Sequence, residues 1–311
     1  TFPKAPGSEA MVRYGVKGKE GELGGESLWC LLSQNVDQRN IQVYRQTIAK
    51  RLVRSGDKVV GVETEQGGRR LKVRARRGII LSTGGLEYNE VMKRDYFSGY
   101  PIHAFGHSGN QGDGLKLAQD VGAELWHMKA LAAPMGYKFP EYDAAFIMWM
   151  SAYGFIIVDQ QGRRFCNETG LEKYSMWMEV ARFDMGGLRF SRIPSHLIFD
   201  ERTRLSGPIT RAGHGANRDY KWSDDNSEEI RRGWIMSGRE PAELARGLGI
   251  DSARQLGETL TAYRKACRTG KDEEFGRSRE TLVELGGRLY GVPLWPCLFN
   301  TQGGPKRNAK G

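Results

Sequence analysis

The sequence predicts an α/β protein built from two domains, and three observations support that prediction. The chain has 311 residues, a length that favours two domains over one. Strand-like alternation and helix-like periodicity both occur, in separate stretches. Hydrophobic residues make up 39% of the chain and charged residues 27%, so the composition is that of a globular protein and argues against disorder.

The first strands are predicted between residues 47 and 75, where apolar and polar residues alternate. Thr47–Val53, Lys58–Thr64 and Arg69–Ala75 each have the period of two that is typical of a half-buried strand. The stretches SGDK and EQGG between them are typical of tight hairpin turns. These residues therefore predict a three-stranded β-meander.

A fourth strand is predicted at Gly78–Ser82, a short apolar run that ends at Thr83, Gly84 and Gly85. Such a run is typical of a strand buried on both faces of a parallel sheet, and parallel sheets bind ligands at the carboxyl ends of their strands. The glycine pair would let backbone amides approach a ligand closely. An ordinary turn has the same residues, so the glycine pair alone leaves both interpretations open.

A second glycine-rich stretch, SGNQGDG, precedes an amphipathic helix. Asp113 is expected at its N-cap and Gly122 at its end. Leu115, Ala118 and Val121 are expected on its inward face. The start of such a helix suits an electron-rich ring or an anion, although the spacing alone favours a helix that is simply well capped. Later helices are predicted to begin at Pro241 and to end at Gly270.

The charge pattern argues against nucleic acid as a partner. The formal net charge is +10 and the isoelectric point is about 9.4. The cationic residues are scattered, apart from Arg69–Arg77, where they alternate with Leu71, Val73 and Ala75. This run favours a strand with one solvated basic face, because no aromatic residues interleave that could stack on bases.

The chain shows no pattern of a metal site or of a membrane span. The four cysteines lie far apart, and the glycines around His103 and His107 argue against a helical metal-ligand pair. The longest apolar stretch, Ala144–Val158, is shorter than the ~20 residues needed to cross a bilayer. We therefore predict that this stretch is core. The sequence does not assign a cellular compartment.

Five stretches occur in an order that resembles the fumarate reductase/succinate dehydrogenase flavoprotein superfamily, in the branch of single-chain FAD-dependent reductases and 3-ketosteroid dehydrogenases. The resemblance covers nearly all of residues 40–311 and is specific as an ordered set. The stretches are ARRGIILSTGGLEYN, GNQGDGLKLAQDVGAEL, DQQGRRFCNE, the helical region from ELARGLGID to KDEEFGR, and TQGGPKRN.

The resemblance implies a Rossmann-like, dinucleotide-type FAD-binding domain with the β-meander, and an α+β capping domain inserted into it. On this plan residues 1–127 belong to the FAD-binding domain, residues 128–292 form the substrate cap, and residues 293–311 return to the FAD-binding domain. The GxGxxG unit of the family is absent from the sequence and residue 1 is Thr, so we expect an internal fragment that lacks both ends.

The resemblance also places the FAD contacts. They would come from the first meander strand, the first glycine pair, the second glycine-rich stretch and a loop near residue 300 that returns to the flavin. The Asp113 carboxylate could accept hydrogen bonds from the ribityl hydroxyls or the ring edge. Ala49 could equally be only a small strand residue. The residues are Ala49, Thr83, Gly84, Gly85, Asp113, Asn300, Thr301, Gly303 and Gly304.

The expected capping domain departs from the fumarate reductases at three positions that handle carboxylates in the family. The position of the proton-donating arginine falls on Glu172. The family's His-Pro is Ala133–Pro134, and its His-His is Phe299–Asn300. Because a carboxylate requires cationic partners, these residues disfavour a fumarate-type substrate.

The same domain is rich in aromatic residues and methionine. Most of these side chains are expected in the core, and a minority would line a pocket for a bulky, flat, largely apolar substrate. A tyrosine hydroxyl could then donate the proton, with Tyr153 and Tyr174 as candidates and Glu172 as a possible relay. Each of the three could instead be structural.

The resulting hypothesis is an FAD-dependent oxidoreductase acting on CH-CH groups, which moves hydrogen across a C–C double bond conjugated to a carbonyl of a steroid-like or aromatic enone or enoate. A small-carboxylate reductase of the fumarate or urocanate type is the alternative within this class. A non-catalytic remnant or basic binding module is the alternative from another class. We expect a small-molecule substrate, an electron donor or acceptor protein or domain, no nucleic acid and no metal.

Overall fold

The structure is a computed structural model that describes residues 24–171, 174–211 and 215–309. Its residues form two compact units. One contains the described residues up to Ala49 together with Thr64–Leu71, and the other contains Lys50–Glu63 and the rest of the described chain.

Helix α1 and the predicted meander come first. α1 spans Gly24–Gln38 and has no buried residue. Strands β1 (Ile48–Ser55), β2 (Lys58–Gln66) and β3 (Arg69–Arg74) form a sheet in the order β1-β2-β3. Their bounds agree with the predicted ones to within two residues, so the meander is confirmed.

The strand predicted at Gly78–Ser82 is wrong. These residues have an irregular backbone, and the side chain of Ile80 is 90% exposed. A strand buried on both faces needs neighbours on either side. In the part of the chain that the structure describes, no strand pairs with this segment.

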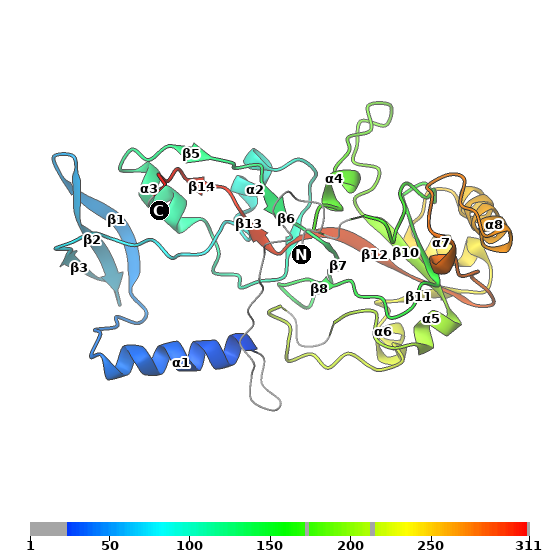
Figure 1. The fold of residues 1–311 in the computed structure, drawn as a ribbon, viewed down its shortest axis with the longest axis horizontal. Coiled ribbons are helices and arrows are strands. Elements are labelled where there is room, and N and C mark those ends of the chain that lie inside the picture. Colours follow the sequence, from blue (N-terminus) through cyan, green and yellow to red (C-terminus); the bar gives the residue numbers. More distant parts are fainter. Residues whose placement is uncertain (1–23, 172–173, 212–214, 310–311) are drawn as a thin grey trace. The chain divides into compact units, whose positions relative to one another are not determined.

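A seven-stranded sheet is built around one long strand, β12. The path of the sheet is β8-β7-β12-β10-β9, and β11 and β4 also pair with β12 (Figure 1). The pairs are antiparallel except β4–β12, which is parallel. The strands are β4 (His103–Ala104), β7 (Met135–Tyr137), β8 (Phe146–Ile147), β9 (Phe155–Val158), β10 (Ser195–Asp200), β11 (Met236–Gly238) and β12 (Leu289–Leu298).

Both faces of the sheet are covered by apolar side chains. In β9, Phe155 and Ile157 belong to one core cluster, while Ile156 and Val158 belong to another that also contains residues of α7 (Pro241–Leu248) and α8 (Ala253–Thr269). This alternation follows from the period of two in a strand. The stretch Ala144–Val158 is therefore largely core, as predicted.

The two long C-terminal helices have the predicted signals. Pro241 is at the first turn of α7, where its missing N–H costs nothing. Ser252 caps α8 by accepting from Gln255 N, and Gly270 ends it in a left-handed conformation. Both predicted helix boundaries are confirmed.

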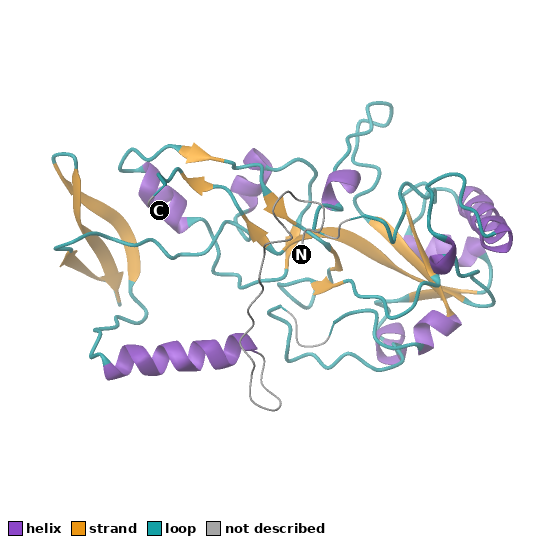
Figure 2. Cartoon of the chain, in the orientation of Figure 1, coloured by secondary structure: helices purple, strands orange, loops and turns teal. Residues whose placement is uncertain are grey.

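The remaining elements are short (Figure 2). The helices are α2 (Glu90–Tyr96), α3 (Asp113–Gln119), α4 (Trp177–Val180), α5 (Glu201–Leu205), α6 (Ser227–Arg231) and the 3-10 helix η2 (Arg279–Thr281). The strand pairs are β5 (Leu125–Trp126) with β14 (Gly304–Pro305), and β6 (Leu131–Ala132) with β13 (Asn300–Thr301).

The start of α3 differs from the prediction. Gly112, with φ of 81°, is the N-cap, and Asp113 is the first residue of the helix. Leu115 and Ala118 are buried as expected. Among the described helices, none combines the length and apolar character needed to cross a bilayer. The predicted domain boundaries, 1–127, 128–292 and 293–311, stay a prediction.

Candidate cofactor site

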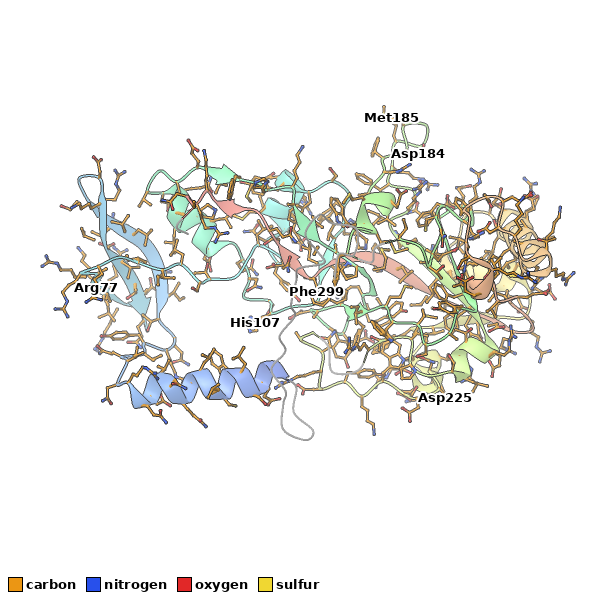
Figure 3. The ribbon with its side chains drawn as sticks, viewed as in Figure 1. Arg77, His107, Asp184, Met185, Asp225 and Phe299 are labelled. Atoms are coloured by element: carbon orange, nitrogen blue, oxygen red, sulfur yellow. The ribbon has the colours of Figure 1, made fainter. Side chains whose placement is uncertain are left out.

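The return loop, residues Phe299–Gly304, follows β12 directly. Figure 3 labels Phe299 at the end of this strand. The loop is held by backbone hydrogen bonds: Phe299 N donates to Ala132 O at 2.8 Å, and Gln302 N donates to Ala130 O at 3.0 Å. At Gly303, an added Cβ would lie 2.5 Å from Met128 Cα, so only glycine fits there. The return loop therefore has a defined position, because it continues from β12 and is hydrogen-bonded to residues 130–132.

The glycine loop, residues Thr83–Glu87, contacts the start of α3. Gly112 N donates to Gly85 O at 2.9 Å. A side chain at Gly114 would collide with Thr83 Oγ1, and one at Gly84 would collide with the side chain of Asn110. Gly84 also has φ of +73°, a backbone conformation that favours glycine. Two of the predicted cofactor segments therefore lie against each other.

The return loop completes this arrangement, although it lies 215 residues further along the chain. Leu86 N donates to Thr301 Oγ1 at 3.4 Å, and Thr301 N donates to Glu87 Oε1 at 3.0 Å. A side chain at Gly85 would collide with Thr301 Oγ1. We call the glycine loop, residues 112–114 and the return loop together the glycine junction.

The glycine junction contains all the predicted cofactor residues except one. The exception is Ala49, which is exposed in strand β1 of the meander. Whether any of these residues contacts FAD stays a prediction. The glycines of the junction let its three segments pack closely on one another, because an added Cβ at Gly84, Gly85 or Gly114 would collide with a neighbouring side chain. The feature of the junction that suits a cofactor is the buried Glu87 Oε2, which has no hydrogen-bond partner among the described residues.

Aromatic side chains surround Phe299, the first residue of the return loop. The Phe299 ring is 5.6 Å from that of Phe105 and 5.7 Å from that of Tyr174, which it meets nearly perpendicularly, at 87°. Ala133 N donates to Tyr174 O at 3.0 Å. Ala133, Tyr174 and Phe299 therefore lie together, although they come from three separate segments of the chain. Edge-to-face packing of this kind suits flat apolar groups.

A family model described as "FAD binding domain" matches residues 9–311. The chain belongs to the FAD binding domain family. The cofactor prediction of FAD and the Rossmann-like fold class are thereby confirmed, and so is the resemblance to the fumarate reductase and 3-ketosteroid dehydrogenase flavoproteins.

Named relatives agree with this membership. NADH:acrylate oxidoreductase from Vibrio harveyi is 28% identical over 287 residues, which are 90% of this chain and 26% of the relative. 3-Oxosteroid 1-dehydrogenase from Mycobacterium tuberculosis is 31% identical over 266 residues, 77% of this chain and 44% of the relative. The chain thus spans between a quarter and a half of the length of these relatives.

A solved structure shows the same fold. The 3-ketosteroid delta1-dehydrogenase from Sterolibacterium denitrificans, in complex with 1,4-androstadiene-3,17-dione, superposes with a TM-score of 0.72. Its sequence is 22% identical, and the match covers 88% of this chain and 52% of that one. At this identity the likeness concerns the fold alone.

The predicted catalytic residue Tyr153 is placed differently from Tyr174. The side chain of Tyr153 is 51% exposed, and its backbone carbonyl accepts from Arg277 Nη2 at 2.6 Å. This contact lies in the network described next, not in the glycine junction. Glu172 lies outside the described residues. The catalytic roles of all three stay predictions.

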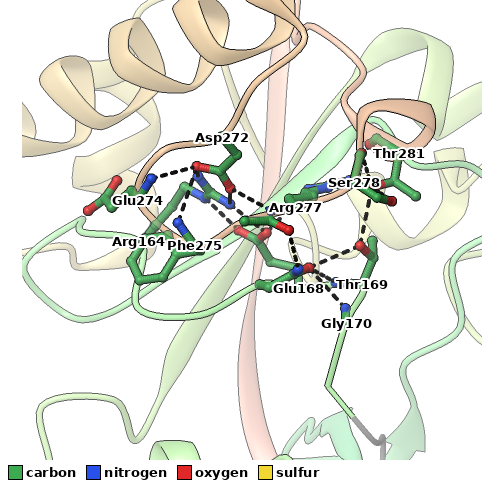
Figure 4. Close-up of polar contacts among 12 residues, drawn as sticks. Arg164, Glu168, Thr169, Gly170, Asp272, Glu274, Phe275, Arg277, Ser278 and Thr281 are labelled. Carbon is green, nitrogen blue, oxygen red and sulfur yellow. Dashed lines mark hydrogen bonds and ion pairs between the residues drawn. The ribbon is translucent and has the colours of Figure 1, made fainter.

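Sequence reasoning missed a buried cluster of four charged side chains, shown in Figure 4. This four-charge network consists of Arg164, Glu168, Asp272 and Arg277, whose side chains are at most 3% exposed. Arg164 donates to both oxygens of Glu168, at 2.8 and 2.9 Å, and to both of Asp272, at 3.3 and 2.9 Å. Arg277 Nη1 lies 3.3 Å from Glu168 Oε2.

The two carboxylates of this network stabilise the charged form of Arg164. Burial by itself lowers the pKa of the Arg164 guanidinium, but hydrogen bonds to Glu168 and Asp272 outweigh it, and the pKa is raised. The network ties the segment after β9 to the segment after α8. The sequence contains a signal for this network, because RRFCNE and KDEEFGR each contain an arginine and an acidic residue. The two stretches are far apart in the sequence, so a local pattern does not show that they pair.

A hollow of about 280 Å³ is lined by residues on both sides of the predicted domain boundary. Burial, reinforced by Asp143, raises the pKa of the Tyr88 phenol to about 12, so this lining residue stays protonated at neutral pH. The hollow also contains two carboxylates, which would repel an anionic ligand. Its lining residues are Tyr88, Gly106, His107, Ser108, Glu141, Tyr142, Asp143, Ala144, Ala216 and Asn217.

Proposed function

We propose that the protein containing this chain is an FAD-dependent oxidoreductase that transfers hydrogen across a C–C double bond conjugated to a carbonyl. Its substrate is a small molecule with a flat, largely apolar body, such as a steroid-like or aromatic enone or enoate. The observation that carries the proposal is the meeting of Ala133, Tyr174 and Phe299 beside the glycine junction.

Two of these residues, Ala133 and Phe299, indicate the class of substrate. Ala133 and Phe299 occupy the positions where the fumarate reductases of the resembling family have histidines that bind carboxylates. Here both side chains are apolar. Ala133 is fully buried and its backbone N–H donates to Tyr174 O, while the ring of Phe299 contacts that of Tyr174 and is partly exposed. An apolar site gains free energy by burying apolar substrate surface, and it leaves a carboxylate without a partner. The names of two relatives, which mention acrylate and a 3-oxosteroid, fit an activated double bond.

The chain would supply the proton and the orientation of the substrate. FAD when bound accepts or donates the hydride. In the reductive direction the Tyr174 hydroxyl donates a proton to the second carbon of the double bond, and in the oxidative direction the tyrosinate removes it. The ring of Phe299, perpendicular to that of Tyr174, would hold a flat substrate against the site.

The test is to reduce the protein without oxygen and to follow the flavin absorbance while adding candidate oxidants one at a time. Reoxidation by an apolar enone, a steroid or an aryl enoate, with fumarate inert, is expected. Tyr174→Phe should slow this reoxidation by about 10²- to 10⁴-fold, the usual contribution of a general acid, without loss of flavin. The matched control, Tyr44→Phe, at a tyrosine that is 49% exposed, should have little effect. Equal loss in both variants, or loss in neither, would remove Tyr174 from its role.

A small-carboxylate reductase is the second candidate, and it is favoured by the relative named for acrylate. Rapid reoxidation by fumarate, urocanate or acrylate, with enones inert, would establish it. For either candidate we propose that electrons are exchanged with another protein or a further domain. The name of that relative includes NADH, so NADH-dependent reduction of the flavin in the purified protein should be measured first.

A further inference from the structure

Glu87 has two carboxylate oxygens in very different situations. The residue is only 4% exposed. Its Oε1 atom accepts from Thr301, with 3.0 Å to the backbone nitrogen and 3.3 Å to Oγ1. Its Oε2 atom is buried too, and no donor within the described residues reaches it. A carboxylate has acceptor sites on both oxygens, so half of this capacity is unused.

The position of this unused acceptor links it to the glycine junction. A Cβ added at Gly85 would lie 2.5 Å from Glu87 Oε1, so the carboxyl group folds back onto the glycine loop. The same oxygen holds Thr301 of the return loop. Buried polar groups without partners are rare in folded proteins, because losing water without gaining a hydrogen bond costs free energy. The buried Glu87 Oε2 atom therefore indicates a hydrogen-bond donor that is supplied by a bound ligand.

We propose that Glu87 Oε2 accepts a hydrogen bond from an N–H or O–H donor of the flavin half of FAD, while Oε1 holds the return loop in place. The flavin ring and the ribityl chain both carry such donors. Glu87 is then at once a contact of the cofactor and the residue that positions Thr301. The inference rests on membership of the FAD binding domain family and does not depend on the proposed substrate class.

The decisive variant is Glu87→Gln, which keeps the size of the side chain. Its carbonyl oxygen can still accept from Thr301, but its amide group then presents hydrogens where an acceptor is required. We expect the Kd for FAD to rise at least about tenfold, as the loss of one buried hydrogen bond implies. The visible spectrum of the remaining bound flavin should also shift. The matched control is Glu273→Gln, at a side chain that is 78% exposed.

The readouts separate a cofactor contact from a purely structural role. Unfolding of the FAD-free protein should have the same midpoint in Glu87→Gln and in the parent, while the stabilisation by added FAD should be smaller in the variant. An FAD affinity within twofold of the parent would overturn the proposal. So would a variant whose FAD-free form is destabilised while its affinity and flavin spectrum are unchanged.

Ligand analogues locate the donor, and the comparison of FAD analogues uses the parent protein alone. The parent protein should bind ADP with an affinity that Glu87→Gln leaves unchanged; an equal loss for ADP and FAD would place the donor in the adenosine half and overturn the assignment. In the parent, either FAD methylated at the ring N3 or FAD lacking a ribityl hydroxyl should bind at least about tenfold more weakly than FAD. If no such analogue loses affinity, the proposal is wrong.

Discussion

The glycine junction and the four-charge network both join segments that lie far apart in the sequence, but they differ in how completely their polar groups are used. In the network, Arg164 makes four hydrogen bonds to two carboxylates, and all four charged side chains are buried. In the junction, close contacts of glycine dominate and Glu87 Oε2 has no partner among the described residues.

This difference indicates that the four-charge network supports the fold and that the glycine junction is the candidate binding site. A network whose charges are all paired has nothing left to offer a ligand, and its role is to hold the fold. A junction with backbone in close contact and a spare acceptor can still gain by binding something. Four predictions can break or sharpen this comparison.

The largest effect is expected from Arg164→Met. The change leaves Glu168 and Asp272 buried without their shared cation, which should reduce the free energy of unfolding by about 3–5 kcal/mol. Urea unfolding at neutral pH measures this. Arg254→Met, which breaks an exposed pair with Glu258, should leave the unfolding curve unchanged. A similar curve for both variants would contradict the scaffold role.

His196 in β10 extends the comparison to a buried group that has no ion-pair partner among the residues that the structure describes. Burial lowers its pKa from 6.5 to about 4, against a small opposing effect of Asp251. In the unfolded chain His196 therefore becomes protonated near pH 6.5, whereas in the folded protein it becomes protonated only near pH 4. Stability should be full above pH 6.5 and should fall towards pH 4, by about 3 kcal/mol from this group.

His196→Leu removes the titrating group, so its loss of stability between pH 7 and pH 4.5 should be smaller than that of the parent. Unfolding free energies from urea titrations at the two pH values give the comparison. If both proteins lose the same amount, His196 does not drive the acid sensitivity.

Gly303→Ala tests the junction itself. The new Cβ would meet Met128 Cα at 2.5 Å and His127 O at 2.7 Å, so backbone must move. Overpacking of this kind should lower the free energy of unfolding by about 1–3 kcal/mol, which urea unfolding measures, and the displaced return loop should also bind FAD more weakly. Titration of the flavin fluorescence measures the affinity. Gly286→Ala, with open space around it, should bind FAD like the parent.

The smallest effect is expected at Gly257 inside α8, where an added Cβ meets no heavy atom within 4 Å. Alanine is favoured over glycine in a helix, so Gly257→Ala should raise the unfolding free energy by up to about 1 kcal/mol. FAD affinity should not change. A loss of stability would mean that the conformation at Gly257 in α8 is set by tertiary contacts and not by helix propensity.

The parts of the fold that depend on local signals were predictable. The meander followed from alternation, and the end of α8 followed from Gly270. The strand at Gly78–Ser82 failed because pairing depends on neighbours that a local pattern does not contain. Asp113 was misplaced by one position because Gly112, in its left-handed conformation, takes the cap.

The site was predictable only in part, for a similar reason. The ordered motifs named the glycine segments, and the structure brings Gly85 and Thr301 together. Glu87 escaped notice because a glutamate in a loop usually faces water, and its hydrogen bonds with Thr301 join segments that lie far apart in the sequence. Tyr153 and Tyr174 were indistinguishable because both lie in aromatic-rich segments, and only the contact of Tyr174 with Phe299 separates them.

The distance along the chain between Gly85 and Thr301 also has a consequence during synthesis on the ribosome. At roughly 5–20 residues per second, about 10–40 seconds pass between the appearance of the two loops. In that interval Glu87 lacks its partner and the glycine junction is open. FAD bound at this junction would therefore be captured only after the return loop has emerged, and not while the glycine loop stands alone.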